Sequence, residues 1–355
     1  MKHGIALSDR LAAASLWLVA AIHILFLVCF AAALVLVTSE ARAEIPECKG
    51  KDIVAELADS DPAKLAEIRA EAEKTPNGKG LLWKIEKDGS RPSYLFGTMH
   101  MTDPRVLELS AQAQAAFDTS GTVAIETTDA LDQKTMTAAM LERPDLMMFT
   151  DGSTLGEHLT PEDAKAVEQA LKARGIPLAS VQKMKPWMLI SLVSLPACEL
   201  ARKSAGAPVL DAKLAVDAKD EGKELVGLES VTEQLSAMAS LPMDLHIRGL
   251  VDTLKLGDRI DDVIETMVVL YKTGETGMFW PLFHAVMPSE DGDTSAYAEF
   301  DEAIVKARNR LMAERAVPII EKGSAFIAVG ALHLPGEEGL VELLRTAGYQ
   351  VTAVE

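Results

Sequence analysis

Short apolar runs that end at a glycine mark the predicted strands of this chain. Residues 94–100 read Tyr-Leu-Phe-Gly-Thr-Met-His, and residues 327–333 read Ile-Ala-Val-Gly-Ala-Leu-His. Four to eight apolar residues bounded by a turn signal are typical of a buried strand. The glycine permits a sharp turn at the end of each strand. His100 and His333 are therefore expected just beyond the carboxyl ends of two strands, where open α/β sheets place their ligands.

The same order of elements follows both histidines. Apolar spacing predicts helices at about 106–117 and 339–345, and strands at 122–126 and 349–355. The strand of the first unit ends in Glu126, that of the second in Glu355, and a further strand at 225–229 ends in Glu229. The sequence thus predicts an α/β fold with a mixed central sheet and a duplicated strand–Gly-x-x-His–helix–strand unit.

Helical periodicity prevails in two other regions, at about 130–205 and 240–316, which we interpret as a large helical insertion. Thr160 followed by Pro161 and two acids is a clear helix start. Residues 81–86 alternate like a strand and should form a hairpin with the strand that leads to His100. The predicted helices of the second region lie at about 244–256, 259–273 and 297–316, with a loop at 274–296.

The N-terminus has the pattern of a targeting segment. Lys2 and Arg10 precede an apolar run at 11–37, and Ala41-Arg42-Ala43 offers a cleavage site. We predict a signal peptide at 1–43, a helical lead-in at 44–79 and the α/β domain at 80–355. Because the apolar run is long enough to span a bilayer, an uncleaved membrane anchor is the alternative. Either way, the predicted location is exported, periplasmic or extracellular.

Composition narrows the classes of partner. The 355 residues are 48% hydrophobic and 25% charged, as expected of a folded protein. A net charge of −18 argues against nucleic acid, whose binders need a basic face, and against docking on anionic lipids. The expected partner is a peptide or small-molecule substrate.

Cysteine usage agrees with export. Cys29 lies in the predicted signal peptide, which leaves Cys48 and Cys198. In an oxidising compartment these two can close one disulfide, although Cys198 fits a buried core thiol equally well. Neither has the spacing of a thiolate metal site.

Several of these residues together resemble the TraB/GumN family, which is related to the TIKI metalloproteases. The matching segments are Ser93–His100, Ala124–Glu126, Gly227–Glu229, Arg308-Asn309 and Ala328–Gly336, and the resemblance covers about residues 80–355. It implies a fold like that of erythromycin esterases and haem-binding ChaN-type proteins. For the TIKI branch it implies divalent-metal-dependent peptide cleavage.

Two imidazoles and a carboxylate form a hydrolytic ligand set for zinc, manganese or cobalt. We predict His100 and His333 as metal ligands, Glu126 as ligand or general base, and Glu229 in the remaining role. Arg308 has donors for a developing oxyanion or a substrate carboxylate, and Asn309 would be an outer hydrogen-bond donor.

The predicted site must be assembled from strands far apart in the sequence. Two buried carboxylates repel each other, so without a metal at least one glutamate should have a raised pKa. Glu355, as the chain terminus, is expected to be uninvolved.

Other interpretations remain open from the sequence. Glu126 and Glu229 would serve equally as buried carboxylates that bridge Arg308 or backbone N–H groups. The two histidines would equally be buried hydrogen-bonding residues. At the level of function, the alternatives to a hydrolase are an exported haem- or ligand-binding protein, with one histidine as axial ligand, and an inactive scaffold.

Overall fold

The computed structural model describes residues 46–286 and 295–354. The predicted signal peptide at 1–43 and the terminal Glu355 lie outside these described residues. From Glu47 onward the described residues belong to one compact unit. Within them, no helix is long and apolar enough to cross a membrane.

Six strands in the described part of the chain form one sheet with the order β4-β3-β5-β2-β1-β6. Strands β2, β5, β3 and β4 are parallel, whereas β1 pairs antiparallel with both β2 and β6. The predicted mixed sheet and the β1–β2 hairpin are therefore confirmed. The strands are β1 (Leu82–Glu86), β2 (Ser93–Thr98), β3 (Thr122–Ile125), β4 (Glu224–Gly227), β5 (Ala325–Gly330) and β6 (Gln350–Ala353).

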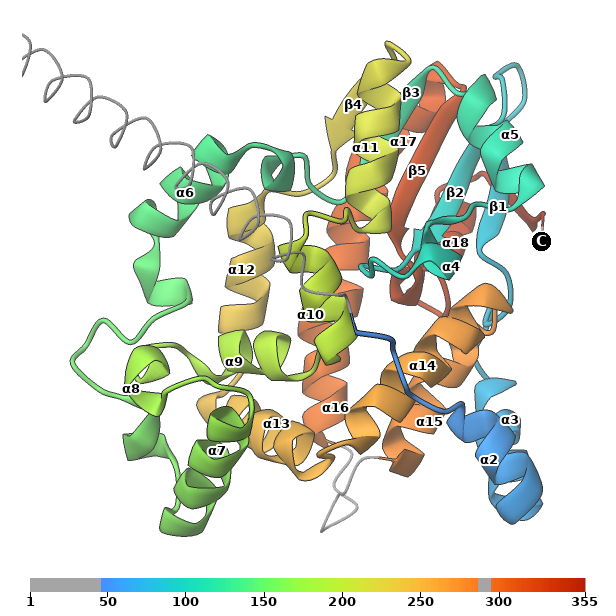
Figure 1. Ribbon diagram of the computed structural model, residues 1–355. Coiled ribbons are helices and arrows are strands. Elements are labelled where there is room, and N and C mark those ends of the chain that lie inside the picture. The colour runs from blue at the N-terminus through green and yellow to red at the C-terminus, as the bar shows by residue number, and fades with distance from the viewer. Residues whose placement is uncertain (1–45, 287–294, 355) are drawn as a thin grey trace, which may run out of the picture. The chain divides into compact units, whose positions relative to one another are not determined.

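Helices account for most of the remaining described residues (Figure 1). The α-helices are α2 (Ile53–Ser60), α3 (Pro62–Ala72), α4 (Pro104–Leu107), α5 (Ala111–Thr119), α6 (Gln133–Glu142), α7 (Pro161–Ala173), α8 (Leu178–Val181), α9 (Pro186–Val193), α10 (Ala197–Ser204), α11 (Leu210–Asp220), α12 (Val231–Ala239), α13 (Met243–Lys255), α14 (Arg259–Lys272), α15 (Phe279–Val286), α16 (Ser295–Phe300), α17 (Ala307–Lys322) and α18 (Leu340–Thr346). The shorter turns are η1 (Asp129–Leu131), η2 (Pro144–Leu146), η3 (Leu155–His158), η4 (Thr276–Met278), η5 (Asp301–Lys306) and η6 (Ala331–His333), of which η5 is a π-helix.

Strand β5 shows why both faces of the sheet are covered. Its side chains alternate, so that Phe326 and Ala328 enter one apolar core while Ile327 and Val329 enter the other. The first core is completed by residues of α5, α11 and α14, and the second by residues of α17 and α18. In Figure 1, α11 and α5 lie in front of the sheet and α17 lies behind it. A strand buried on both faces is typical of a parallel sheet.

The predicted helical insertion forms its own apolar cluster. Residues of α7, α9 and α13 pack together around Leu171, Leu189 and Leu250. Thr160 caps α7 as predicted, because its side chain accepts a hydrogen bond from the backbone N–H of Asp163. Apolar residues of the lead-in helices α2 and α3, among them Ile53, instead belong to the first core of the sheet.

The strand–Gly-x-x-His–helix–strand unit is present twice, but the last strands of its two copies pair differently. Strand β3, which follows the first Gly-x-x-His motif, pairs parallel with β5 in the middle of the sheet. Strand β6, which follows the second motif, lies at the opposite edge and pairs antiparallel with β1. The last strands of the two units therefore lie in different places in the sheet, because the hairpin strand β1 occupies the place beside β2.

Three predicted elements have different bounds. The helix at 106–117 is divided into α4 and α5, because Glu108 is extended and Ser110 caps a new helix. The predicted helix at 297–316 contains the π-helix η5 and runs on to Lys322. The predicted loop at 274–296 contains η4 and α15 up to Val286, and residues 287–294 lie outside the described residues.

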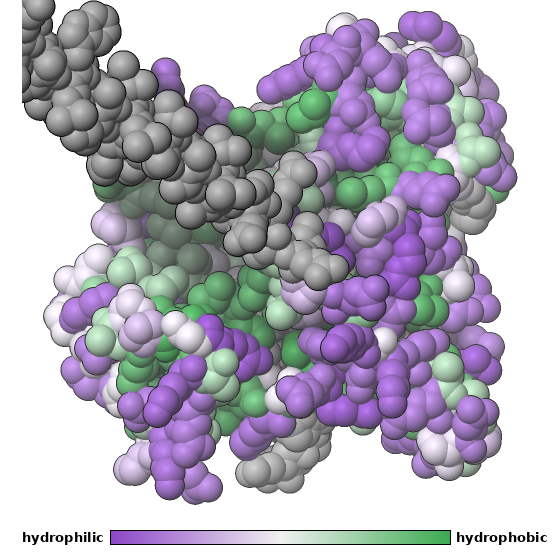
Figure 2. Space-filling view, in the orientation of Figure 1, coloured by the Kyte–Doolittle hydropathy of each residue, from purple (hydrophilic) through white to green (hydrophobic). Residues whose placement is uncertain are grey.

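On the face drawn in Figure 2, hydrophilic side chains dominate the surface over α11 and α14, with apolar atoms visible between these areas. Such hydrophilic areas are expected of a chain in which 25% of the residues are charged.

Candidate functional site

The two Gly-x-x-His motifs end neighbouring parallel strands. Strands β2 and β5 pair with Thr98 opposite Gly330, so the motif glycines are offset by one residue in the ladder. His100 follows β2 through a short non-helical segment, whereas His333 lies in the 3₁₀ turn η6. As a result, the side chain of His100 is 57% exposed while that of His333 is 7% exposed.

Glu126, immediately after β3, lies between the two histidines. Its Oε1 atom is 3.8 Å from Nε2 of His100 and 3.8 Å from Nε2 of His333. The two imidazole nitrogens are thus no more than twice that distance apart, within the roughly 8 Å expected of a shared site. Burial leaves the Glu126 side chain only 7% exposed.

Arg308 joins Glu126 to the second predicted carboxylate. Its Nη2 atom donates to Oε2 of Glu126 at 2.7 Å and to Oε2 of Glu229 at 2.6 Å, and its Nε atom donates to Glu229 at 3.1 Å. The remaining nitrogen, Nη1, donates to the carbonyl of Ile304 at 3.3 Å. The guanidinium therefore faces two carboxylates of the protein, which is the bridging arrangement considered as an alternative from the sequence.

Asn309 determines which nitrogen of His333 carries the proton. The Asn309 amide nitrogen donates to the carbonyl of Glu338 at 2.8 Å, so its oxygen faces Nδ1 of His333, at 2.6 Å. An amide oxygen only accepts, which requires His333 to be protonated at Nδ1. The lone pair of His333 is then at Nε2, on the side of Glu126. Asn309 therefore acts on His333 as an acceptor.

The environment sets the charges of these groups. Burial lowers the pKa of His333 to about 4, so its imidazole is neutral at physiological pH. The charge of Asp211 and its hydrogen bond raise the pKa of His100 to about 9. Burial alone would raise the pKa of Glu126, but the two histidines and Arg308 together lower it to about 2.

For Glu126, the expectation of a raised pKa without a metal was wrong. The protein itself provides a positive charge, because Arg308 donates to Oε2 of Glu126. The backbone N–H of Gly330 also donates to Oε1 of Glu126, at 2.7 Å. These contacts favour the ionised carboxylate even without a bound cation.

Because Gly330 has no side chain, the three central side chains can lie close to its backbone. A Cβ atom at this position would lie 3.1 Å from Oε1 of Glu126, 3.9 Å from Nε2 of His100 and 3.5 Å from Cδ2 of His333. The small space that a Gly330 side chain would occupy is therefore a cradle bounded by two imidazoles and a carboxylate.

Two polar residues in the site were not predicted. Asp211, in the first turn of α11, accepts from Nδ1 of His100 at 2.7 Å. Gln234, on α12, donates to Glu126 at 3.0 Å and to Glu229 at 3.4 Å. Both lie on helices outside any motif, so only their placement beside the sheet identifies them.

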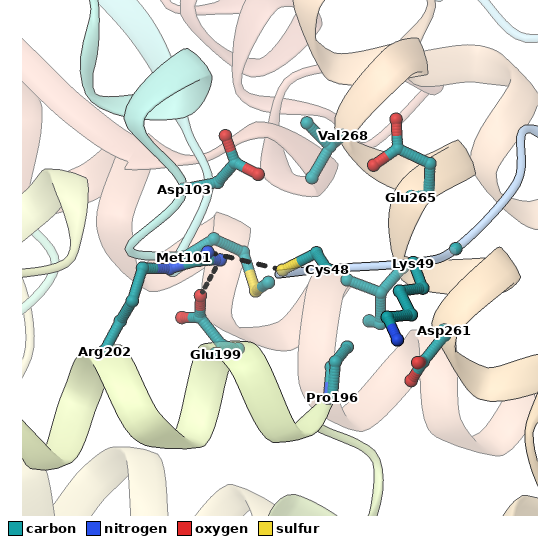
Figure 3. A pocket seen from close by; sticks show the side chains of 12 residues that line it. Cys48, Lys49, Met101, Asp103, Pro196, Glu199, Arg202, Asp261, Glu265 and Val268 are labelled. Carbon is teal, nitrogen blue, oxygen red and sulfur yellow. Dashed lines mark hydrogen bonds and ion pairs between the residues drawn. The ribbon is translucent and has the colours of Figure 1, made fainter. Parts of the chain in front are cut away.

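Cys48 and Cys198 are joined by a disulfide, with their Cα atoms 5.3 Å apart. A small pocket lies beside it, and Figure 3 shows Arg202 reaching towards both Cys48 and Glu199 there. None of the predicted metal or catalytic residues lines this pocket. Its link to the site is indirect: the fully buried Glu199 accepts from the backbone N–H of Thr102 at 2.8 Å, two residues after His100.

Among the described residues, no group of three or more histidine, cysteine, aspartate or glutamate side chains has the spacing of a formed metal site. Glu126 Oε1 is nevertheless close to each of the two imidazole Nε2 atoms. Two ligand atoms on a tetrahedral zinc ion at 2.0–2.1 Å lie about 3.3 Å apart, so the observed 3.8 Å is wider by about 0.5 Å.

The chain is similar in sequence to proteins named as metalloproteases. It is 25% identical over 315 residues to Metalloprotease TIKI1 of Danio rerio, an alignment that covers 76% of this chain and 62% of that protein. It is 24% identical to the Metalloprotease TIKI homolog of Nematostella vectensis, covering 79% and 68% of the two chains. It is 25% identical to Metalloprotease TIKI1 of Homo sapiens, an alignment that covers 76% of this chain and 61% of that protein. The chain thus spans about three fifths of the length of the two TIKI1 proteins.

No solved structure matches the chain significantly. The erythromycin esterase/ChaN-like description therefore stays a prediction, although nothing in the mixed α/β architecture conflicts with it. The model of the TraB/PrgY/gumN family matches residues 81–353, which include both Gly-x-x-His motifs, Glu126, Glu229 and Arg308. This chain belongs to the TraB/PrgY/gumN family.

Proposed function

We propose that this protein is a divalent-metal-dependent hydrolase with peptidase-like activity, and that His100, His333 and Glu126 hold the metal. The observation that carries the proposal is the convergence of two imidazole Nε2 atoms on one carboxylate oxygen, each 3.8 Å from it. In each imidazole the other nitrogen is bound by an orienting group, Asp211 or Asn309. This arrangement is usual for metal-binding histidines.

The charge of the site supports a divalent cation. Asp211, Glu126 and Glu229 supply three carboxylates, and Arg308 supplies one guanidinium. With both imidazoles neutral, as metal binding requires, two negative charges remain uncompensated. One divalent cation would balance them. A buried carboxylate beside both imidazoles also suits a divalent cation better than the apolar face of a haem.

The residues of the site then have separate roles in the proposed reaction. A bound cation would act as a Lewis acid that activates a water molecule and polarises the substrate carbonyl. Glu126 offers Oε1 on the side of both imidazoles, while Glu229 and Gln234 hold Arg308 and the second oxygen of Glu126. The exposure of the His100 side chain supports an approach of the substrate from that side of the site. Names of the TIKI relatives favour a peptide substrate.

Export belongs to the same proposal. The Cys48–Cys198 disulfide supports it, since such bonds persist in oxidising compartments. The predicted signal peptide at 1–43 would direct the chain there.

The first prediction tests the metal and its ligands. Protein beginning at Glu44 should bind about one equivalent of manganese, zinc or cobalt, measured by elemental mass spectrometry after dialysis against each ion. His100→Ala and His333→Ala should each lower the affinity at least tenfold. His158→Ala is the matched control, since this surface histidine stacks on Phe149 away from the site.

Activity is measured on a panel of peptides and esters, with and without added metal. Cleavage that is lost on chelation and restored by one of the three metals supports the hydrolase. Full metal retention by both site variants would contradict the proposed ligands. Iron with a Soret absorption band would favour the haem-binding alternative.

A further inference from the structure

Asp211 is a carboxylate outside both Gly-x-x-His motifs and outside the short segments that resemble the family. It lies in the first turn of α11, and its side chain is 13% exposed. Its two oxygens have different partners at the end of β2. Oδ1 accepts from the hydroxyl of Thr98 at 2.7 Å, and Oδ2 faces Nδ1 of His100, also at 2.7 Å. One carboxylate thus connects α11 to Thr98 and to His100, the residues before and after Met99 in this segment.

His100 needs such a restraint more than its counterpart does. Its side chain is 57% exposed, so packing contributes little to fixing its ring. The next charged partner in the described structure, Oε1 of Glu126, is beyond hydrogen-bond distance at 3.8 Å. His333, by contrast, is 7% exposed and lies in a buried turn. Asp211 is therefore the short polar contact that sets the direction of the His100 ring.

The support of Asp211 itself is rigid. Thr98 is the last residue of β2 and lies opposite Gly330 in the parallel ladder with β5. Helix α11 packs through Leu210 and Leu214 into the core on that face of the sheet. The Asp211 carboxylate is thus held between a central strand and a packed helix, and an exposed histidine is fixed by buried elements.

We propose that Asp211 is the positioning residue of His100: its carboxylate, held by Thr98, turns Nε2 of His100 towards Glu126. Because a carboxylate accepts hydrogen bonds, it keeps a proton on Nδ1 and leaves Nε2 to face the cradle above Gly330. This inference rests on the proposed function in one respect: positioning matters for activity only if Nε2 binds a metal.

The test compares two variants that carry the same charge. Asp211→Asn and Asp211→Ala both remove the negative charge, but only asparagine keeps an acceptor for Nδ1. Its amide nitrogen would face Thr98, whose hydroxyl can accept as well as donate. Any loss of affinity that comes from charge alone is therefore equal in the two variants.

Metal affinity is the first readout. Titration calorimetry with manganese or zinc should show that Asp211→Ala binds about 10–100-fold more weakly than Asp211→Asn, the range typical of groups that orient a metal ligand. Asp217→Ala is the control, because Asp217 lies on the same helix and pairs with Lys213 at 2.6 Å on the surface. It should bind as the wild type does. Equal affinities for Asp211→Ala and Asp211→Asn would overturn the positioning role.

The second readout needs no metal. Carbon-13 relaxation of the His100 Cε1–H bond reports the order of the imidazole ring in the metal-free protein. The ring should be ordered in the wild type and in Asp211→Asn, and mobile in Asp211→Ala. An equally ordered ring in Asp211→Ala contradicts the inference. If the wild type binds no metal and the ring still becomes mobile, the proposed function fails while the positioning role stands.

Discussion

His100 and His333 hold the same place in their motifs but have opposite ionisation properties. The pKa of His100 is raised to about 9 by Asp211, and that of His333 is lowered to about 4 by burial. At neutral pH the first imidazole is protonated and the second is neutral. The difference arises mainly from the orienting partner: the ionised carboxylate of Asp211 outweighs burial at His100, whereas the neutral amide of Asn309 does not offset burial at His333.

This difference predicts how metal binding depends on pH. A metal must displace a proton from His100 below pH 9, whereas His333 is already neutral above about pH 4 and Glu126 is ionised above about pH 2. Affinity should therefore rise about tenfold per pH unit between about 5 and 9, since one proton is released per metal bound.

Calorimetry in buffers of different ionisation enthalpy measures the released protons directly. At pH 7 we expect about one proton released by the protein for each metal ion. Release of none across this range would show that His100 is not a ligand or is not protonated in the metal-free protein.

Gly330 is the residue whose lack of a side chain matters most. Its backbone angles, φ −52° and ψ 134°, are open to alanine, so Gly330→Ala should fold. Its new methyl group would lie 3.1 Å from Oε1 of Glu126, in the space that we assign to the metal. We expect metal affinity to fall at least tenfold, with a thermal unfolding midpoint within a few degrees of the wild type.

Gly156→Ala is the matched control, because a Cβ atom there has nothing within 4 Å. Should Gly330→Ala bind metal as tightly as Gly156→Ala does, the cation would have to lie elsewhere.

At the scale of elements, helix α17 supplies hydrogen-bond partners to two different parts of the site. Arg308 and Asn309 are consecutive in α17, and successive helical residues point about 100° apart. Arg308 reaches the two glutamates while Asn309 reaches His333. The π-helix η5 ends at Lys306, two residues before Arg308, and its Ile304 carbonyl accepts from Arg308. Such π segments are frequent at functional sites, because they change the direction of the residues that follow.

The strands contribute through their register. With Thr98 opposite Gly330, the second motif extends one residue further along the sheet than the first. The 3₁₀ turn η6 then folds His333 back, so that both Nε2 atoms reach the same oxygen of Glu126. Identical spacing in the sequence thus gives two different local structures that meet at one point.

At the scale of the whole molecule, the Cys48–Cys198 disulfide links distant parts of the described chain. It joins the segment before α2 to α10 across 150 residues of sequence. Replacing both cysteines by serine should lower the free energy of unfolding by about 2–4 kcal/mol, mainly because the unfolded chain gains freedom. Denaturant unfolding monitored by circular dichroism measures this change.

Reductant provides the internal control for this prediction. It should destabilise the wild type by a similar amount and leave the double serine variant unchanged. Coincident unfolding curves for oxidised wild type and the variant would contradict a stabilising role for the disulfide.

The strands, the hairpin and most helices follow from the amino-acid pattern, because apolar periodicity and caps act over a few residues. Tyr94–His100 and Thr160–Pro161 carry their own signals. The motifs likewise identified His100, His333, Glu126, Glu229 and Arg308 as residues that would meet. The place of β6 was not predictable, since strand order depends on which edges the rest of the chain leaves free.

Only the tertiary structure decided what surrounds the motif residues. Asp211 and Gln234 lie on helices with no motif, and only the packing of α11 and α12 brings them to the site. The tertiary structure also brings Arg308 against two carboxylates. Its charge helps to keep Glu126 ionised and to lower the pKa of Glu126. Local sequence specifies which side chains are available, but burial and charge at a site depend on partners from distant parts of the chain.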